Sequence, residues 1–280
     1  MWILEKPLIE EALGDIARVI TESNDNLTEA DAILLKNLYR LYDWQGGTIS
    51  EKQDVMLGES ARNALYNLYD KTQEGRRLSY IRTLLFSAVD ICPMCGIQPP
   101  SQLDHQMPRS KFKSLSVCRQ NLVPICGVCN NKKRASDAST FVHPYYDHDL
   151  KDLPFFVIEI HSSPVTHRMS WKFSINEKVV GNPTLAAKIS TQVGVVKLFR
   201  RLYKETSNLL SDLLFDAEDW SDETFKFVMQ REYRKYLCRR GTNDWHTVFI
   251  KALLDSPRFS LQEAKVYAHK ITPVNKGVNG

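Results

Sequence analysis

Two Cys-x-x-Cys pairs are the most informative feature of this sequence. Cys92 and Cys95 form the first pair, and Cys126 and Cys129 form the second. Thiolates two residues apart can bind the same ion, and two such pairs complete the tetrahedral coordination typical of structural zinc. The alternatives are chance pairs or a redox-active pair, but a redox motif needs only one pair. The spacing therefore predicts one structural Zn²⁺ bound by these four residues.

The segment between the two pairs contains groups that can do hydrolytic chemistry. Asp104 and His105 stand at the end of a short predicted strand, and residues 122–125 form a second short apolar strand. A helix is predicted from about residue 128, where small and polar residues give way to Lys and Arg. The expected order is strand, long loop, strand and helix. In this arrangement Asp104, His105, Asn121 and Asn130 face one cleft.

This segment resembles the ββα-metal core of HNH endonucleases, over residues 92–136. The family pattern is Cys-x-x-Cys, Asp-His with Pro three residues later, Asn-Leu-x-Pro, and Cys-x-x-Cys-Asn with Lys close behind. Each element occurs here in order: Cys92/Cys95, Asp104-His105, Pro108, Asn121-Leu122-Val123-Pro124, and Cys126/Cys129-Asn130 followed by Lys132. The last letter of the motif is Asn130 rather than His, a familiar substitution in this family. An amide oxygen is a suitable ligand for a hard cation.

The residue types fit phosphodiester hydrolysis. A His side chain with an ordinary pKa of about 6.5 can accept a proton from water near neutral pH, which makes His105 the expected general base. Asp104 offers an anionic oxygen to a divalent ion and Asn130 a neutral one, and Asn131 is the alternative ligand. Two protein ligands leave room for phosphate and water, which suits Mg²⁺ or Mn²⁺. Neighbouring strand residues point to opposite sides, so a backbone bend is expected at Asp104.

The resemblance adds roles that the residue types alone do not give. It implies that the catalytic ion sits on the scissile phosphate and the 3′ leaving oxygen. It also implies that Asn121 braces the loop and orients the base. His143 comes just after the core. The sequence leaves two roles open for it, a further metal ligand or a packing residue.

The basic residues near the motif indicate a polyanionic partner. Residues 1–80 carry nine Lys and Arg against 14 Asp and Glu, whereas the remaining 200 carry 28 against 19. Within 106–136 no acidic residue occurs, and a solvated loop is the plainer interpretation of this stretch. Its basic residues are Arg109, Lys111, Lys113, Arg119, Lys132, Lys133 and Arg134. The expected DNA phosphate contacts among them are Arg109, Lys111, Lys132 and Lys133.

The predicted fold class is α+β, a mostly helical chain around a small zinc-stapled ββα-metal module, with a short antiparallel β-ribbon after it. The expected domains are a helical region at 1–80, the nuclease module at 81–148, and a mixed, then helical region at 149–280. Apolar spacing predicts helices across the first region, and the alternation in Trp171-Lys-Phe173-Ser-Ile175 predicts a strand in the last. The tail from about Thr272 is expected to fray.

The wider layout resembles the HNH subunits of bacterial anti-phage operons of the Septu and retron type. That resemblance implies a partner ATPase encoded alongside, and this chain contains no Gly-x-x-x-x-Gly-Lys-Ser/Thr loop of its own. No apolar run approaches the roughly 20 residues of a membrane span, so no membrane partner and a cytoplasmic location are expected.

Three alternatives to a DNA endonuclease stay open from sequence: a zinc-stabilised nucleic-acid-binding module without cleavage, an RNase of the same fold, and a stand-alone restriction or homing enzyme. The last of these needs a sequence-reading element, and no recognition helix is evident in either flank.

Overall fold

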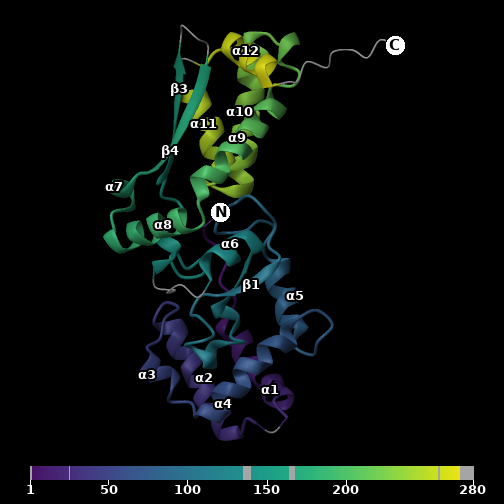
Figure 1. Cartoon of the computed structure of the whole chain (residues 1–280), viewed down its shortest axis with the longest axis vertical. Coiled ribbons are helices and arrows are strands. Elements are labelled where there is room, and N and C mark those ends of the chain that lie inside the picture. The colour runs from purple at the N-terminus through teal and green to yellow at the C-terminus, as the bar shows by residue number, and fades with distance from the viewer. Residues whose placement is uncertain (1, 25, 135–139, 164–167, 258, 272–280) are drawn as a thin grey trace. The chain divides into compact units, whose positions relative to one another are not determined.

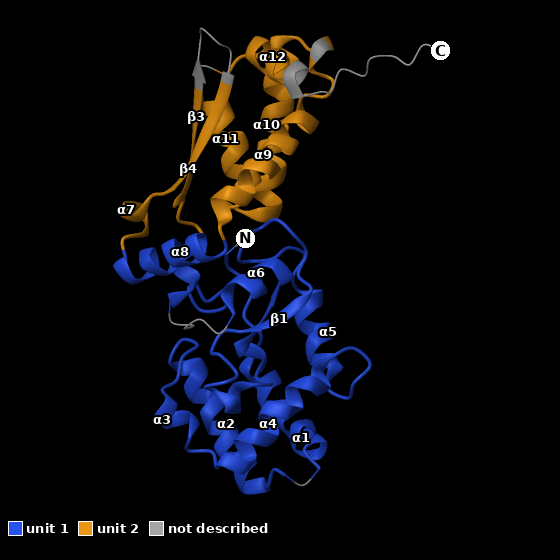
Figure 2. Ribbon diagram, in the orientation of Figure 1, with its two compact units in different colours: residues 1–150, 182–196 blue, residues 151–181, 197–280 orange. Residues whose placement is uncertain are grey.

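The computed structural model describes residues 2–24, 26–134, 140–163, 168–257 and 259–271 (Figure 1). The chain divides into two compact units (Figure 2). Unit 1 comprises Met1–Leu150 together with Asn182–Val196, and unit 2 comprises Lys151–Gly181 and Lys197–Gly280. Unit 1 therefore holds both the predicted N-terminal helical region and the cysteine pairs.

The N-terminal part of unit 1 is helical, as the apolar spacing predicts. Its helices are α1 (Ile9–Glu22), α2 (Glu29–Trp44), α3 (Glu51–Asp54), α4 (Glu59–Leu68) and α5 (Ser79–Ser87), with a 3-10 turn η1 (Tyr69–Thr72) after α4. Thr28 begins α2 with a capping box, because its side chain accepts from the Asp31 N–H and the Asp31 carboxylate accepts from the Thr28 N–H. Gly46 and Gly47 end the α2 segment with positive φ angles of 68° and 82°.

The strand–loop–strand–helix arrangement predicted around Asp104 is present. Strand β1 (Gln102–His105) pairs antiparallel with β2 (Leu122–Ile125), so that His105 lies opposite Leu122. Helix α6 (Gly127–Lys133) follows β2 directly. The long loop between the strands contains two 3-10 turns, η2 (Lys113–Leu115) and η3 (Arg119–Asn121). Helix α8 (Pro183–Val195) also belongs to unit 1.

The N-terminal helices and this small motif share one hydrophobic core. Tyr42 of α2 and Leu65 of α4 belong to the same buried cluster as Leu103 of β1, Leu115 of the loop and Leu122 of β2. A two-stranded ribbon with a seven-residue helix buries too little apolar surface to be stable alone. The helices therefore supply the packing that holds the ribbon.

Unit 2 contains the predicted antiparallel ribbon and the C-terminal helices. Strand β3 (Phe156–Ser163) pairs with β4 (Arg168–Ile175). The helices are α7 (Glu177–Val180), α9 (Leu198–Leu213), α10 (Asp222–Arg240), α11 (Trp245–Asp255) and α12 (Leu261–Ile271), with a 3-10 turn η6 (Ala217–Asp219) before α10. Helices α8 and α9 are separated at Lys197, whose φ is 51°. The mixed α+β fold class is confirmed, and the predicted fraying from 272 lies outside the described residues.

Candidate functional site

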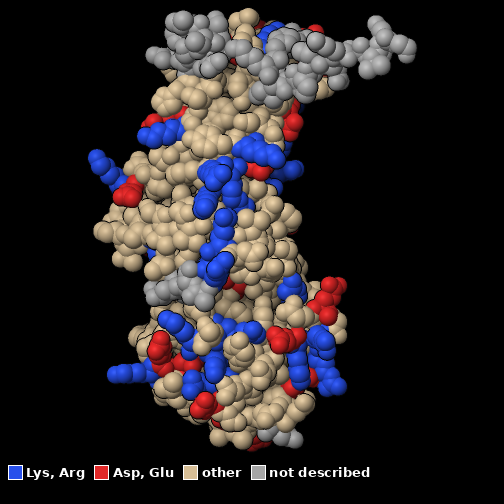
Figure 3. Space-filling model, viewed as in Figure 1, with Lys and Arg blue, Asp and Glu red and all other residues tan. Residues whose placement is uncertain are grey.

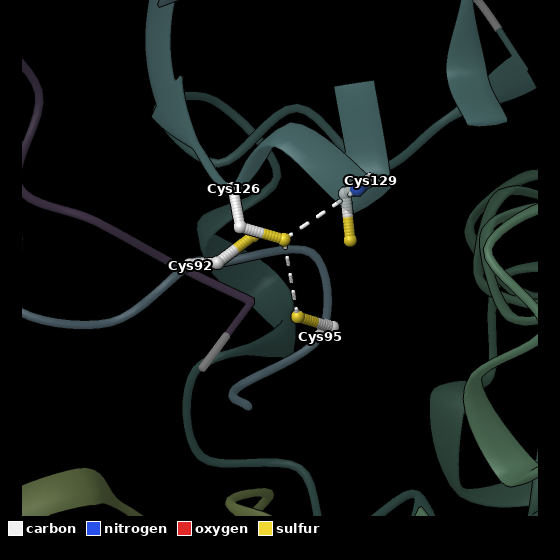
Figure 4. Close-up of side chains that lie close together, drawn as sticks. All are labelled: Cys92, Cys95, Cys126 and Cys129. Carbon is white, nitrogen blue, oxygen red and sulfur yellow. Dashed lines mark hydrogen bonds between the residues drawn. The ribbon is translucent and has the colours of Figure 1, made fainter. Parts of the chain in front are cut away.

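The four paired cysteines converge on one point (Figure 4). All are buried, and their sulfur atoms lie within 4.8 Å of one another. The Sγ atoms of Cys95 and Cys126 are 3.9 Å apart, and a tetrahedral zinc site with Zn–S bonds of about 2.3 Å needs about 3.8 Å between sulfurs. The thiols thus fit one structural zinc ion.

Local backbone geometry explains this convergence. Gly96 follows the first pair with a φ of 63°, and its N–H donates to the carbonyl oxygen of Cys92 at 2.8 Å. Cys126 caps the N-terminus of α6, where its sulfur accepts from the Cys129 N–H at 3.4 Å. Each pair is therefore folded into a tight turn with both sulfur atoms on the same side.

The predicted catalytic residues, with the exception of Asn121, line a cleft of about 670 Å³. Asp104 and His105 come from the end of β1, and Asn130 and Asn131 come from α6. The other wall includes Arg109 from the loop. Both neighbouring residues of β1 border the same cleft, in line with the chemistry expected of them.

The imidazole of His105 is held in one tautomer. Its Nε2 lies 2.9 Å from the carbonyl oxygen of Ser116, which can only accept a hydrogen bond. Nε2 therefore carries the proton, and Nδ1 keeps a free lone pair. Burial lowers the pKa of His105 to about 4; the Ser116 hydrogen bond opposes the shift, and the charges of Arg109 and Lys133 add to it. The ring is neutral at pH 7 and ready to accept a proton at Nδ1.

Asp104 forms a buried ion pair with Lys133. Its Oδ2 accepts from the Lys133 ammonium and, at 3.1 Å, from the amide of Gln106. Both members of the pair are almost fully buried, and Lys133 also donates to the carbonyl oxygen of His105 at 3.3 Å. Burial raises the pKa of Asp104, and Lys133 counteracts this. Lys133 therefore does not fit the predicted role of a phosphate contact, because its buried ammonium group is paired with the Asp104 carboxylate.

Two oxygen atoms at the cleft are suited to a divalent ion. Oδ1 of Asp104 accepts no hydrogen bond within the part of the chain that the structure describes. The amide nitrogen of Asn130 donates to the Gln102 side chain at 2.7 Å, so the amide oxygen is the end left to act as a ligand. One anionic and one neutral oxygen are ligands that Mg²⁺ accepts. Asn131 is exposed at the same cleft.

Asn121 is a buried brace and does not line the cleft. Its Oδ1 accepts from the Met107 N–H at 2.7 Å and from the Tyr42 hydroxyl at 3.3 Å. Its amide nitrogen donates to the carbonyl oxygens of Met107 and Leu115, each at 3.2 Å. One side chain thus ties both ends of the loop that follows His105 to helix α2.

His143 takes part in the same network. Its Nδ1 accepts from the Tyr145 N–H at 3.3 Å, so Nε2 carries the proton and donates to the Tyr42 hydroxyl at 3.0 Å. Full burial lowers the pKa of His143 well below its ordinary value. This places His143 among packing residues rather than beside the thiols or the cleft.

The remaining predicted phosphate contacts lie near the cleft in different settings. Arg109 has its guanidinium 4.2 Å from the ring centre of Tyr66 and 4.7 Å from that of Tyr69. It also pairs at 3.4 Å with the exposed Asp70. Lys111 is exposed and Lys132 is partly exposed. Arg109 is thus a positioned cation, whereas the two lysines are ordinary surface charges.

Tyr66 and Tyr69 form an aromatic wall of the cleft that no sequence motif indicates. The Tyr69 ring packs against the His105 ring at a tilt of 59°, with the ring centres 4.5 Å apart, and its hydroxyl donates to the Leu103 carbonyl oxygen at 3.0 Å. Tyr66 and Tyr69 come from α4 and η1, about 40 residues before the motif. No local pattern links a helix stripe to so distant a loop, so only the folded chain reveals the contact.

With this geometry in place, comparison with known proteins gives a consistent result. Residues 92–136 match the HNH endonuclease family. These residues form an HNH endonuclease domain. The protein ea31 of Escherichia phage lambda is 33% identical over 90 residues, which is 30% of this chain and 30% of that relative. The chain thus aligns with less than a third of this relative's length. No solved structure matches the chain significantly.

We predict that Lys133→Met destabilises the HNH domain by about 3–5 kcal/mol, because it leaves the buried Asp104 carboxylate without its cationic partner. Chemical denaturation measures the effect. Lys132→Met, at a more exposed neighbouring position, is the matched control and should change the unfolding free energy little. Unchanged stability with weaker DNA binding would instead return Lys133 to the role of a phosphate contact.

Asn121→Ala is expected to lower the free energy of unfolding by about 1–3 kcal/mol, since the Met107 N–H loses its buried acceptor. Tyr42→Phe removes one hydrogen bond and is expected to cost about 1 kcal/mol. Denaturant titration compares both with Asn37→Ala on the exposed side of α2. Equal stabilities for Asn121→Ala and Asn37→Ala would contradict a bracing role.

Proposed function

We propose that this protein is a divalent-metal-dependent HNH endonuclease that hydrolyses phosphodiester bonds of DNA. The observation that carries the proposal is the convergence on one cleft of a neutral His105 with a free Nδ1 and of two oxygen ligands, from Asp104 and Asn130. A module that only binds nucleic acid needs none of these three groups.

The residues divide the reaction between them. Nδ1 of His105 takes a proton from the attacking water, while the Ser116 carbonyl oxygen holds the ring by Nε2 and stabilises the imidazolium that forms. Asp104 and Asn130 would hold Mg²⁺ or Mn²⁺, which when bound stabilises charge on the phosphate and the leaving oxygen. Arg109, whose guanidinium packs against the rings of Tyr66 and Tyr69, would contact the phosphate backbone.

The biological setting that we propose is anti-phage defence under the control of a partner ATPase. The HNH domain together with the Septu-like and retron-like layout of the sequence supports it. The chain contains no phosphate-binding loop that would supply its own nucleotide switch. None of the helices in the described ranges is long and apolar enough to cross a membrane. The partners that we propose are DNA and a separate ATPase.

A substrate panel tests the proposed activity. Purified protein is incubated with supercoiled plasmid, single-stranded DNA and RNA, in Mg²⁺, in Mn²⁺ and in EDTA, with and without the ATPase encoded beside it. Ion-dependent cleavage of DNA is the expected result. Cleavage of RNA alone would establish the RNase alternative. DNA binding without cleavage of any substrate, including in the presence of the ATPase, would establish the non-cutting alternative.

A further inference from the structure

Two of the seven basic residues between 106 and 136 are not available to contact DNA phosphates. Of the basic residues between 106 and 136, Lys133 is buried against Asp104, and Arg119 is buried in an ion pair with Asp15 whose Nη2–Oδ1 distance is 2.8 Å. Contacts to phosphate supply most of the affinity of proteins for DNA. Cations elsewhere on the chain can therefore add to the affinity for DNA that the residues at the cleft supply.

Helix α9 in unit 2 offers such contacts on one face. Arg200 and Lys204 lie one turn apart on this helix, and Lys197 directly precedes it. All three side chains are exposed, and none forms an ion pair within the described ranges. Lys and Arg also gather over the part of unit 2 where α9 lies (Figure 3). We define Lys197, Arg200 and Lys204 as the α9 basic face.

The packing of α9 fixes this face outward. Leu202, Leu209 and Leu210 on the opposite side of the helix are buried. Tyr203, at the edge of the face, is 45% exposed and packs edge-on against Phe173 with ring centres 4.8 Å apart. The cations are therefore presented by a rigid element. The acidic residues of α9 are Glu205, which directly follows Lys204, and Asp212.

We propose that the α9 basic face is a second DNA-binding surface, which contacts the phosphates of duplex DNA. This inference rests on the proposed nuclease function. Seven residues of helix span about 10 Å, and one strand of duplex DNA carries about three phosphates over that length. Three cations on one helix face match that spacing. Because they contact only the backbone, they raise the affinity of the whole chain for DNA without setting its sequence preference.

The test measures the salt dependence of DNA binding by the full chain. The variant carries Lys197→Gln, Arg200→Gln and Lys204→Gln. The control carries Lys36→Gln, Arg40→Gln and Lys52→Gln, three exposed cations of the N-terminal helices whose loss changes the net charge equally. Both are made with His105→Ala so that the duplex is not cut. Fluorescence anisotropy with a labelled duplex gives the dissociation constant at several salt concentrations.

The variant is expected to reduce the slope of log affinity against log salt by about 2–3, because each lost phosphate contact removes about 0.9. The control is expected to keep the slope. Equal slopes for the two triple variants would overturn the proposal while leaving DNA cleavage by the chain with His105 intact. Polyglutamate, a model of an acidic protein surface, is the second ligand. If the triple variant of the α9 basic face loses binding to polyglutamate but keeps its DNA binding, the face binds an acidic protein instead. Absence of any DNA binding by the chain with an unaltered α9 would refute both this proposal and the nuclease.

Discussion

His105→Ala is expected to reduce the rate of DNA cleavage by about 10²–10⁴, the usual contribution of a positioned general base. The side chain is held by the Ser116 carbonyl oxygen and by the ring of Tyr69, so its loss removes the proton acceptor without removing a metal ligand. Single-turnover cleavage of a labelled duplex in Mg²⁺ measures the effect. Zinc content and DNA affinity are expected to stay at the level of the protein with His105.

A matched substitution makes this result specific. His161→Ala, at an exposed histidine of unit 2, is expected to cleave at the unaltered rate. Added imidazole is expected to restore part of the activity of His105→Ala. It is not expected to raise the rate of the His161→Ala control. Unchanged cleavage by His105→Ala would show that another group accepts the proton, and the assignment of the base would be wrong.

The depressed pKa of His105 also sets the pH dependence. The free ring must be neutral to act, and its pKa is about 4 rather than about 6.5. Protonation therefore inactivates the base only well below neutral pH. The single-turnover rate should stay nearly constant between pH 7 and about 5.5, whereas the neutral fraction of a histidine with a pKa of about 6.5 would fall from about three-quarters to about a tenth over that range. Such a fall would mean that the ring is not buried.

Removal of zinc is the second large effect that we expect. Structural zinc contributes about 10–16 kcal/mol of apparent binding free energy in small zinc-folded peptides. Cys126→Ser removes one of the four zinc ligands at the N-cap of α6, the helix that carries Asn130, while serine can still cap the helix. We predict loss of bound zinc, a lower melting temperature and no cleavage. Strong chelation of the unaltered protein should have the same effects.

The exposed Cys238 provides the control for this experiment. Cys238→Ser should keep one zinc per chain by elemental analysis and an unchanged melting temperature. Two outcomes would contradict the zinc assignment. One is full stability and cleavage of Cys126→Ser, and the other is a protein with all four cysteines that contains no zinc after expression with zinc present.

Local patterns were enough to predict much of this site. The two Cys-x-x-Cys pairs fixed the zinc ligands because the two-residue gap leaves little freedom of geometry. The apolar strand 122–125 and the polar helix after it could be placed because their periodicities differ. Local patterns could not predict which charged side chains are buried in ion pairs and which are exposed. Lys132 and Lys133 are equivalent in sequence, yet only Lys133 is buried against Asp104.

Long-range contacts account for the rest of what the sequence did not reveal. The Tyr42–Asn121 hydrogen bond joins residues 79 positions apart, and Tyr66 reaches Arg109 from α4. Such contacts depend on how the helices pack. The periodicity of a helix shows that one of its faces is buried, but it does not show which element that face packs against. The break between α8 and α9 has a different cause, because Lys197 takes a positive φ angle that a lysine in the sequence does not indicate.

The central claim is that the cleft formed by β1 and α6 is a divalent-ion-dependent nuclease centre, and the Mg²⁺ dependence of plasmid nicking tests it most directly. Nicking by the unaltered chain is predicted to require the ion and to saturate with it. Asn130→Ala is predicted to shift the midpoint to higher Mg²⁺ concentration, whereas the neighbouring Asn131→Ala keeps it. Nicking in EDTA, or identical midpoints for both variants and the unaltered protein, would contradict the account.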